Sequence, residues 1–345
     1  MTELDYIIVG GGFGGLFFAH QLIKHGHSFK IFSADAPSAS QVSAGVINPV
    51  VLKKFTTFWK AQEQISNLHS VLAALENYLG KNYWINEPVK RVFHDEAEKE
   101  LWLKKAQKEE LKPFLDLNFS TISGINNPAA TGTVLQSGRL DVHHFFKDFY
   151  VFLEENNFLV REEFLYQDLL TESNIYHHYK FKNVVFCEGM GVSANPFFQK
   201  IPVQPNKGHH LKVSLQQPIE EKVTIKKKHF LFPLQDGNYY YGGTYDRDGR
   251  TFEVDEKAVS ELKNGLETVY PSTYELLKVE VGFRPTVQDR RPILGRHSDF
   301  KNLYVFNGLG ARGVLNSSYF SKNLYDFIEN QIDLPFEVDV IRFNK

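Results

Sequence analysis

The chain has 345 residues, of which 42% are hydrophobic and 23% charged, a composition typical of a folded protein of about two domains rather than a disordered one. Its 39 basic and 41 acidic residues give a formal net charge of −2, which predicts no general attraction to nucleic acids or anionic membranes. A single cysteine, Cys187, excludes an intramolecular disulfide. The acidic start of the chain does not resemble a secretory signal, and the most apolar stretch, residues 6–19, is too short to span a bilayer. We therefore expect a cytoplasmic protein.

The first forty residues predict a strand, a glycine-rich turn, a helix and a second strand. Residues 6–9 are apolar and mostly β-branched, as in a buried parallel strand. Apolar residues at helical spacing run from 16 to 25, Gly26 is suited to the end of that helix, and residues 28–32 form the next strand. The turn between the first strand and the helix has glycines at G-x-G-x-x-G spacing, namely Gly10, Gly12 and Gly15.

Each of these glycines has its own physical role. Gly10 permits the turn, Gly12 lets the backbone approach a pyrophosphate, and Gly15 lets the helix pack closely on the strand. The anion would lie at the positive end of the helix, beside Phe13 and Gly14. This context predicts a dinucleotide-binding turn, and the alternative is a glycine-rich turn without a ligand.

The residue that would hold the ribose of the dinucleotide is less well defined. An acidic residue is expected at the end of the second strand, but this sequence has Ser33 there, and the next acid is Asp35. We prefer Asp35 as the ribose ligand. A weak bond from Ser33, or a turn that starts at Asp35, remains the alternative.

The middle of the chain changes pattern. Residues 58–79, 96–114 and 255–269 are predicted to be helices, the first two of them rich in charge. Four segments alternate as antiparallel strands do, namely residues 208–213, 223–225, 230–233 and 239–243. This indicates a second lobe built on an antiparallel sheet, with a substrate pocket between the two lobes.

The last seventy residues contain a second glycine-rich turn. Residues 279–283 and 303–306 are predicted to be strands, and a helical pattern continues to Ile328 after the turn of residues 307–314. A nicotinamide dehydrogenase has no particular need for this turn. A flavin enzyme can direct such a helix N-terminus at the flavin ring, where negative charge develops on reduction.

These motifs, in this order, resemble the glycine oxidase and D-amino acid oxidase family of FAD-dependent oxidoreductases over most of the chain. Residues 40–49 resemble the loop beside the pyrophosphate and flavin ring, residues 138–141 resemble the start of a helix, and residues 184–189 resemble a strand and turn that return to the cofactor. From the motifs and the resemblance together, the candidate FAD-binding residues are Gly10, Gly12, Phe13, Gly14, Gly15, Ser33, Asp35, Ser40, Ser43, Ala44, Gly45, Val46, Cys187, Glu188, Gly189, Gly308, Gly310, Ala311, Arg312, Gly313 and Val314.

The resemblance implies an α/β fold with an α+β second lobe: a Rossmann-like FAD-binding domain with an interleaved antiparallel-sheet substrate domain. We expect the FAD-binding domain to contain residues 1–80, 131–200 and 284–345, and the substrate domain residues 81–130 and 201–283. Cys187 ends an apolar strand, where a buried thiol is the default interpretation. It is poorly placed for a covalent flavin bond, so we expect noncovalent FAD.

Four residues are candidates for contact with the substrate. In the resembled oxidases, the arginine of the Gly-Phe-Arg-Pro motif binds the substrate carboxylate, which implies this role for Arg284, with an ion pair to Asp289 or another acid as the alternative. A guanidinium can hold a carboxylate with two hydrogen bonds. Tyr241 and Tyr245 are weaker candidates, since tyrosines in strands are usually packing residues. Arg312 is equally suited to the flavin, to a substrate anion or to a surface ion pair.

The expected activity is FAD-dependent oxidation of a C–N bond in a small amine or amino acid, for example an N-substituted glycine, by hydride transfer to flavin N5 and on to oxygen or another acceptor. Residues 40–49 and 308–313 also resemble the oxidase half of bifunctional proteins that make 5-methylaminomethyl-2-thiouridine in tRNA, although no methyltransferase half is present and the longest lysine run is residues 226–228. A tRNA wobble-uridine oxidase, an NAD(P)-dependent dehydrogenase and a non-catalytic FAD-binding protein are therefore kept as alternatives. The adjacent histidine pairs lack the spacing of metal ligands, so no metal is expected.

Overall fold

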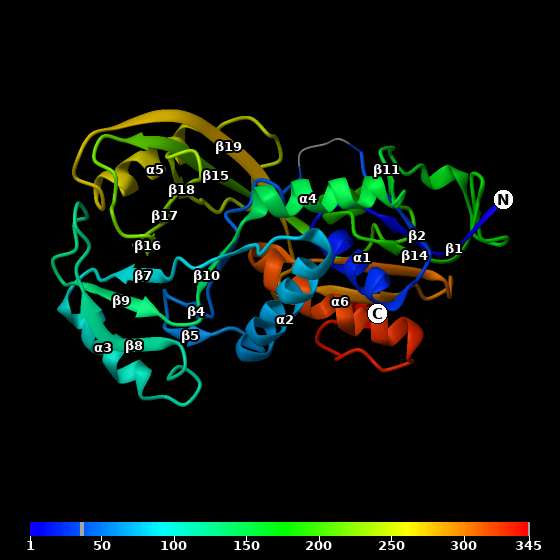
Figure 1. The fold of residues 1–345 in the computed structure, drawn as a ribbon, viewed down its shortest axis with the longest axis horizontal. Helices are drawn as coiled ribbons and strands as arrows, with labels where there is room; N and C mark the ends of the chain where they lie inside the picture. The colour runs from blue at the N-terminus through cyan, green and yellow to red at the C-terminus, as the bar shows by residue number, and fades with distance from the viewer. Residues whose placement is uncertain (35–37, 344–345) are drawn as a thin grey trace.

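The computed structural model describes residues 1–34 and 38–343, and its two large sheets form two lobes (Figure 1). In the first sheet, the central strands run parallel to their neighbours, and the strand at the end of the order given next runs antiparallel to its neighbour. In spatial order they are β11 (Leu159–Val160), β2 (Phe29–Phe32), β1 (Thr2–Val9), β14 (Tyr179–Phe186), β21 (Leu303–Asn307) and β20 (Ile293–Arg296). Two short strands, β12 (Leu169–Leu170) and β13 (Ile175–Tyr176), extend the sheet beside the start of β14.

Both faces of this sheet are buried toward the carboxyl ends of its central strands, which explains why β1 and β14 end in the apolar runs of residues 6–9 and 184–186. One face packs against the helices of the largest hydrophobic core, and the other against loops and short turns that form a second core. The covering helices are α1 (Phe13–His25), α2 (Ala61–Leu79), α4 (Val142–Glu155) and α6 (Gly313–Glu329). Among the described residues, no helix is both long enough and apolar enough to cross a membrane.

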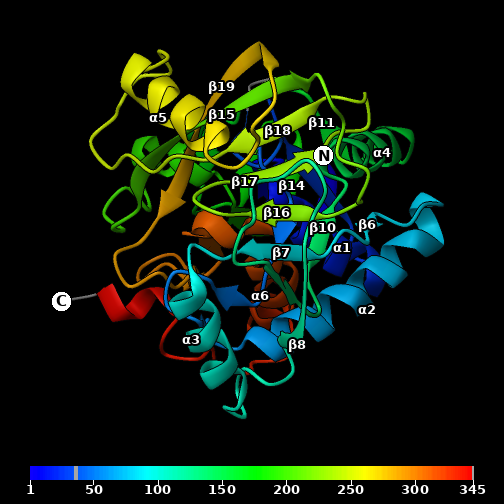
Figure 2. The same ribbon diagram turned by 90° about the vertical axis from the view of Figure 1, so that its left-hand side faces the viewer.

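The second sheet faces the viewer in Figure 2. Its spatial order is β19 (Tyr274–Thr286), β15 (Gln204–Leu215), β18 (Tyr239–Gly242), β17 (Phe230–Pro233), β16 (Thr224–Lys226), β7 (Val89–Val92), β9 (Thr131–Val134) and β8 (Leu115–Ser120). Helix α5 (Glu256–Glu267) packs on one face of the sheet, and α3 (Glu96–Ala106) lies beside β8. All neighbours are antiparallel except β16 and β7, which are parallel because the chain crosses through the other lobe between them.

Short strands and turns connect the lobes. One small sheet contains β3 (Val46–Ile47), β10 (Gly138–Leu140) and β6 (Trp84–Ile85), and another contains β4 (Val50–Val51) and β5 (Thr56–Thr57). Single 3₁₀ turns cover residues 166–168, 189–194, 310–312 and 340–343. The predicted α/β fold with a second sheet-based lobe is confirmed.

Some predicted boundaries were wrong. Helix α3 ends at Ala106 rather than residue 114, because turns follow and Pro113 disfavours helix at the residue before it. Residues 138–140 form a strand, and the helix begins only after Asp141. Strand β9, which the sequence places in the FAD-binding domain, pairs with β7 and β8 of the second sheet. The division into domains otherwise stays a prediction.

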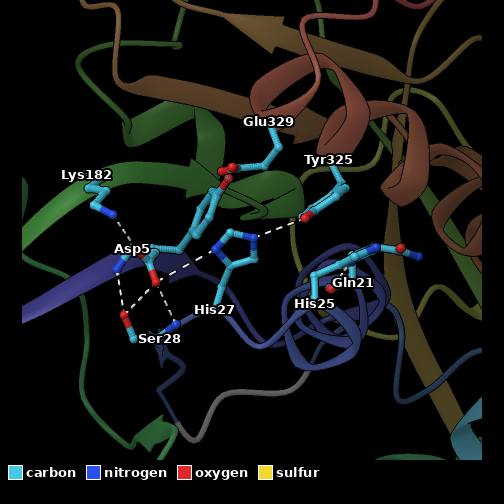
Figure 3. A network of polar contacts seen from close by, with 9 residues as sticks. Asp5, Gln21, His25, His27, Ser28, Lys182, Tyr325 and Glu329 are labelled. Atoms are coloured by element: carbon cyan, nitrogen blue, oxygen red, sulfur yellow. Dashed lines mark hydrogen bonds and ion pairs between the residues drawn. The ribbon is translucent and has the colours of Figure 1, made fainter.

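A network of polar contacts lies on the first sheet, toward the end of its strands that is opposite the glycine turns (Figure 3). Asp5 accepts hydrogen bonds from Lys182 Nζ at 2.7 Å and from the Ser28 amide at 2.9 Å. Burial alone would raise the pKa of Asp5, but these hydrogen bonds lower it to about 2. Tyr6 donates to Glu329 at the end of α6, so this network ties β1 to the last helix.

Candidate functional site

The ends of four parallel strands meet at one edge of the first sheet. Val9 pairs with Phe32 on one side and with Phe186 on the other, and Phe186 pairs with Val305. The turns that follow these strands therefore lie next to one another. In open parallel sheets, ligands bind outside this carboxyl edge. The sequence candidates Gly10, Ser33, Cys187 and Gly308 all lie there.

The first glycine turn has the close packing that the sequence predicts. Gly10 has a φ of +104°, which L side chains rarely adopt, and a Cβ at this position would lie 2.5 Å from the carbonyl oxygen of Cys187. At Gly15 a Cβ would lie 1.9 Å from the carbonyl oxygen of Gly10. Helix α1 therefore approaches β1 more closely than any residue with a side chain would allow.

The two glycine-rich turns are in contact, although they come from opposite ends of the chain. A Cβ at Gly313 would lie 3.2 Å from the Phe13 ring, and one at Gly14 would lie 3.6 Å from the Leu309 side chain. The side-chain Nδ2 of Asn307 donates to the carbonyl oxygen of Gly189 at 2.9 Å, which joins the last turn to the turn after β14. One ligand at this edge could therefore contact all of these turns.

The helices of the chain begin in two ways. Helices α3, α4 and α5 start at Asp95, Asp141 and Asp255, whose carboxylates accept from their first-turn amides. Among the described helices, α1, α2 and α6 begin at Gly12, Lys60 and Arg312 without such a cap. Uncapped helix N-termini offer N–H donors and positive potential to an anion.

The loop of residues 40–46 lies against the start of α1. The Phe13 amide donates to Ser40 Oγ at 3.1 Å, and Gly45 accepts from the Leu140 amide at 2.8 Å just before Val46 enters β3. The Ser43 hydroxyl, next to Ala44, is buried without a partner among the described residues. An orphaned hydroxyl in a loop that contacts the uncapped start of α1 fits the polar groups of FAD, so we infer that these turns and this loop would hold it.

In the turn after β14, the side chain of Glu188 is hydrogen-bonded to other residues of the protein. Glu188 accepts from Asn195 Nδ2 at 2.7 Å and from the Tyr166 hydroxyl. Burial raises the pKa of Glu188, an effect that these hydrogen bonds oppose. Cys187 is buried, which raises the pKa of its thiol. The expected buried thiol is therefore present, and noncovalent binding of FAD stays a prediction.

The ribose-binding residue stays open. Asp35 lies outside the described residues. The Ser33 hydroxyl is 2.9 Å from the hydroxyl of Tyr150, which donates to the carbonyl oxygen of Gly11 at 3.0 Å. Tyr150 comes from α4 and was not a candidate, because its position more than one hundred residues away gives no local signal.

Arg284 lies on the second sheet, on the face toward the loop of residues 40–46. It shares this face with Gly282, where a Cβ would lie 2.8 Å from Val42 of that loop. Its guanidinium donates to the carbonyl oxygen of Thr244 at 3.0 Å and lies 4.4 Å from the centre of the Tyr245 ring. Among the described residues, no carboxylate is within 4.0 Å of it. Asp289, the alternative partner, pairs with Arg342 at 3.0 Å.

The neighbouring tyrosines of β18 point to opposite faces. Tyr241 is buried in the core under α5 and faces away from Arg284, so its position does not support contact with the substrate. Tyr240 lies on the Arg284 side: burial raises its pKa, and the charge of Arg284 opposes this rise. Tyr240 stacks on His210, whose ring is 2.8 Å from Glu280 Oε2.

Sequence reasoning missed Tyr240, His210 and Glu280, although alternation along β15, β18 and β19 could have placed them on one face. The hydrogen bond from His210 holds the pKa of Glu280 at about 2, against the opposing effect of burial. Glu280 is therefore ionised at neutral pH. It and His210 form a polar wall beside Arg284.

Arg312 follows the second glycine turn at the start of α6. Its guanidinium lies 4.6 Å from the centre of the Phe58 ring, and no ion pair to it is found among the described residues. Burial lowers the pKa of Arg312, and the nearby Arg290 and Arg291 lower it further, whereas Tyr245 raises it. The surface ion pair considered for Arg312 is thus absent from the described part of the chain. Ala311 beside it is exposed, and Val314 is buried in α6.

The sequence is similar to curated bifunctional proteins. It is 24% identical to the bifunctional protein ThiO/ThiG of Trichormus variabilis, over 96% of this chain and 53% of that protein. It is 26% identical to the tRNA 5-methylaminomethyl-2-thiouridine biosynthesis bifunctional protein MnmC of Leptospira borgpetersenii, over 39% of this chain and 26% of that protein. The chain thus spans about half or less of the length of these relatives.

Solved structures share the fold. Glycine oxidase from Bacillus cereus superposes with a TM-score of 0.78 at 21% identity, over 96% of both chains. Iminodiacetate oxidase from Chelativorans gives the same TM-score at 15% identity, over 96% of this chain and 98% of the other. Residues 5–326 match the family described as DAO, FAD dependent oxidoreductase. Because this match spans nearly the whole chain, the protein belongs to the DAO family of FAD-dependent oxidoreductases.

Proposed function

We propose that this protein oxidises the C–N bond of a carboxylate-bearing amine, such as an N-substituted glycine. The observation that carries the proposal is Arg284, a half-buried guanidinium with no carboxylate partner among the described residues, facing the loop that contacts the cofactor turn. A buried charge is costly unless a partner compensates it. A substrate carboxylate is a partner of the right charge and shape.

The surroundings of Arg284 hold its guanidinium in place. Its hydrogen bond to Thr244 and its contact with the Tyr245 ring fix the plane of the guanidinium, while its other N–H groups stay available. A bidentate grip would orient the substrate so that its reacting C–H bond has one direction. FAD, when bound, supplies the acceptor for the hydride and its two electrons.

The polar wall beside Arg284 would position the amine. Tyr240 keeps its proton because burial raises its pKa, so its hydroxyl can donate a hydrogen bond. Its ring is held between His210 and Phe232, with ring centres 4.5 Å and 4.6 Å away. This stack would also exclude water from one side of the substrate. No acid or base beyond these groups is required for orientation.

The relatives support a more specific variant of this activity. The structural neighbours are named for glycine and iminodiacetate, and the curated relatives include proteins of tRNA modification. A carboxymethylaminomethyl group on a tRNA nucleoside carries the same amine and carboxylate as an N-substituted glycine. We therefore keep a modified tRNA as a second candidate substrate, with the electron acceptor open.

The test is reduction of the purified holoenzyme by candidate substrates in the absence of oxygen. The reduction is monitored as a loss of the visible flavin absorbance. Glycine, sarcosine, iminodiacetate, D-amino acids and modified tRNA are the substrates to compare. Reduction by carboxylate-bearing amines, and not by the same amines without the carboxylate, is the expected result. If none of them reduces the flavin, the proposed function is wrong.

Substitution of Arg284 separates binding from folding. Arg284→Gln should lower kcat/KM for amino acids by at least about tenfold for each charged hydrogen bond lost. Arg284→Lys should restore part of this loss, because lysine keeps the charge but not the fork. Both variants should retain FAD. Equal activity in Arg284→Gln and the wild type would contradict the assignment. Full reduction of the flavin by amines that lack a carboxylate would also contradict the role of Arg284, while the proposed cofactor site would be unaffected.

A further inference from the structure

A second cationic pocket lies between the first turns of α2 and α6, and Arg312, described above at the start of α6, forms part of its wall. It is open to solvent on the side of Arg290, which is exposed. Its lining includes two aromatic rings, an amide and three guanidinium groups: Phe58, Trp59, Gln64, Arg290, Arg291 and Arg312.

The positive charges in this pocket are not balanced by protein. Among the described residues, no carboxylate lies within 4.0 Å of the side chains of Arg290, Arg291 or Arg312. Asp289, which is adjacent in sequence, pairs with Arg342 at 3.0 Å and also accepts from the backbone amide of Arg291. Three like charges that gather without a counterion repel one another, so an anion between them is stabilised.

Aromatic rings hold these cations in fixed positions. The Arg312 guanidinium lies 4.6 Å from the centre of the Phe58 ring, and that of Arg291 lies 4.7 Å from the centre of the Trp59 ring. The ammonium group of Lys60 lies 5.3 Å from the same Trp59 ring. Contact with a ring face leaves the edges of a guanidinium, which carry its N–H donors, free for a ligand.

The helices on both sides add to the positive potential. Helix α2 begins at Lys60 and α6 at Arg312, and within the described chain neither of these residues caps its helix through a side-chain hydrogen bond. A cation at a helix N-terminus opposes the helix dipole. Helix α2 has Glu63 in its first turn, whereas the first turn of α6 has no acidic residue, so Arg312 is the less favourable of the two without an anion. Elsewhere α3, α4 and α5 place an aspartate at this position.

A buried amide in the lining also lacks a partner. Gln64 is only 1% exposed, and its carbonyl oxygen has no hydrogen-bond partner within the described residues, although its nitrogen donates to the carbonyl oxygen of Trp59 at 3.3 Å. An amide nitrogen carries two N–H donors, and the bond to Trp59 uses one of them. The second N–H is left for a ligand in the pocket.

We infer that Arg290, Arg291 and Arg312 form a second anion-binding site, which takes a carboxylate or phosphate group. The two sites are neighbours, because strand β19, which carries Arg284, contacts the turn of residues 310–312 that ends at Arg312. The site therefore suits a ligand with two anionic groups, one at each arginine site. That this ligand is the substrate rests on the proposed function, whereas the anion site itself does not.

The test measures anion binding by anaerobic calorimetry to the FAD-loaded enzyme whose flavin has first been reduced, so that no amine is oxidised during the titration, with inorganic phosphate, glycine and iminodiacetate as probes. Phosphate should bind the wild type. Iminodiacetate, with two carboxylates, should bind about tenfold more tightly than glycine, as one additional charge-assisted contact predicts. Arg291→Gln and the double variant Arg290→Gln/Arg291→Gln should weaken phosphate binding by about tenfold or more and abolish the preference for iminodiacetate.

Arg296→Gln is the matched control, because Arg296 is an exposed arginine on β20 that pairs with Tyr304 at the opposite end of β21. It should leave phosphate binding and the preference unchanged. The assignment would be overturned if Arg291→Gln did not weaken phosphate binding, or if Arg296→Gln weakened it equally. It would also be overturned if phosphate bound only to the protein without FAD. A protein that binds phosphate at this site but oxidises no amine would keep the anion site and lose the proposed function.

Discussion

The contact between α1 and β1 can be tested by adding one methyl group. In Gly15→Ala the new Cβ would lie 1.9 Å from the carbonyl oxygen of Gly10 and 3.4 Å from Ile31 Cδ1. Carbon and oxygen atoms keep a separation of about 3.3 Å even in close C–H···O contacts, so the helix would have to move by roughly 1.4 Å. Such overpacking costs about 1–3 kcal/mol, against a gain in helix propensity of about 1 kcal/mol. We expect a net loss of up to about 2 kcal/mol.

The adjacent glycine provides the control. In Gly14→Ala the new Cβ would lie 3.6 Å from its nearest neighbours, which is ordinary van der Waals contact. Only the helix-propensity gain remains, so this variant should be as stable as the wild type or more stable by up to about 1 kcal/mol. The two substitutions add the same methyl group to the same turn, and only the distance to β1 differs.

Urea denaturation of the FAD-free protein measures the two free energies of unfolding without a contribution from ligand binding. The expected result is a lower midpoint for Gly15→Ala and an equal or higher one for Gly14→Ala. A titration with FAD should then show weaker binding to Gly15→Ala, because the turn has moved. Equal stability of the two variants would mean that α1 does not approach β1 this closely, and the argument for a tight cofactor turn would fail.

Two further predictions concern the second sheet. Tyr240→Phe should lower kcat/KM for a carboxylate-bearing amine, whereas Tyr241→Phe should leave it unchanged, because only the Tyr240 hydroxyl is on the Arg284 face; equal effects in steady-state assays would refute this assignment. The pKa of Glu280 in the folded protein is about 2, below its usual value of 4.5, so its bond to His210 stabilises the fold above pH 4.5 and is lost as the pH falls toward 2. Urea midpoints measured from about pH 6 to pH 3 should therefore fall more steeply for the wild type than for Glu280→Gln, and parallel curves would contradict the role of this pair.

The fold at the two ends of the chain could be predicted because its signals are local. A buried strand, a glycine-rich turn and an amphipathic helix follow one another within residues 6–25, and the same order recurs within residues 303–328. Parallel strands with these connections place both turns at one sheet edge. The contact between Phe13 and Gly313 is the result of that rule rather than of any local pattern.

The substrate side could be predicted only in part, because it depends on contacts between distant strands. Arg284 was found from its motif, but its partner Thr244 and the neighbouring Tyr240 depend on the pairing of β15 with β18 and β19. His210 belongs to an adjacent histidine pair that looks unremarkable in sequence. Its role follows from direct pairing with Glu280, seventy residues later.

The net charge of the whole chain gives no sign of the group of arginines that bears most on function. A net charge of −2 predicts no attraction to anions, and the described carboxylates near the site are already engaged: Asp289 by Arg342, Glu280 by His210, and Glu188 by Tyr166 and Asn195. The fold therefore engages these acids locally and leaves a group of arginines without a carboxylate partner among the described residues. Since a counterion would stabilise half-buried guanidinium groups, we expect the ligand that completes the site to bring the negative charge. This is why an amine that lacks a carboxylate should be a poor substrate even if it fits the space.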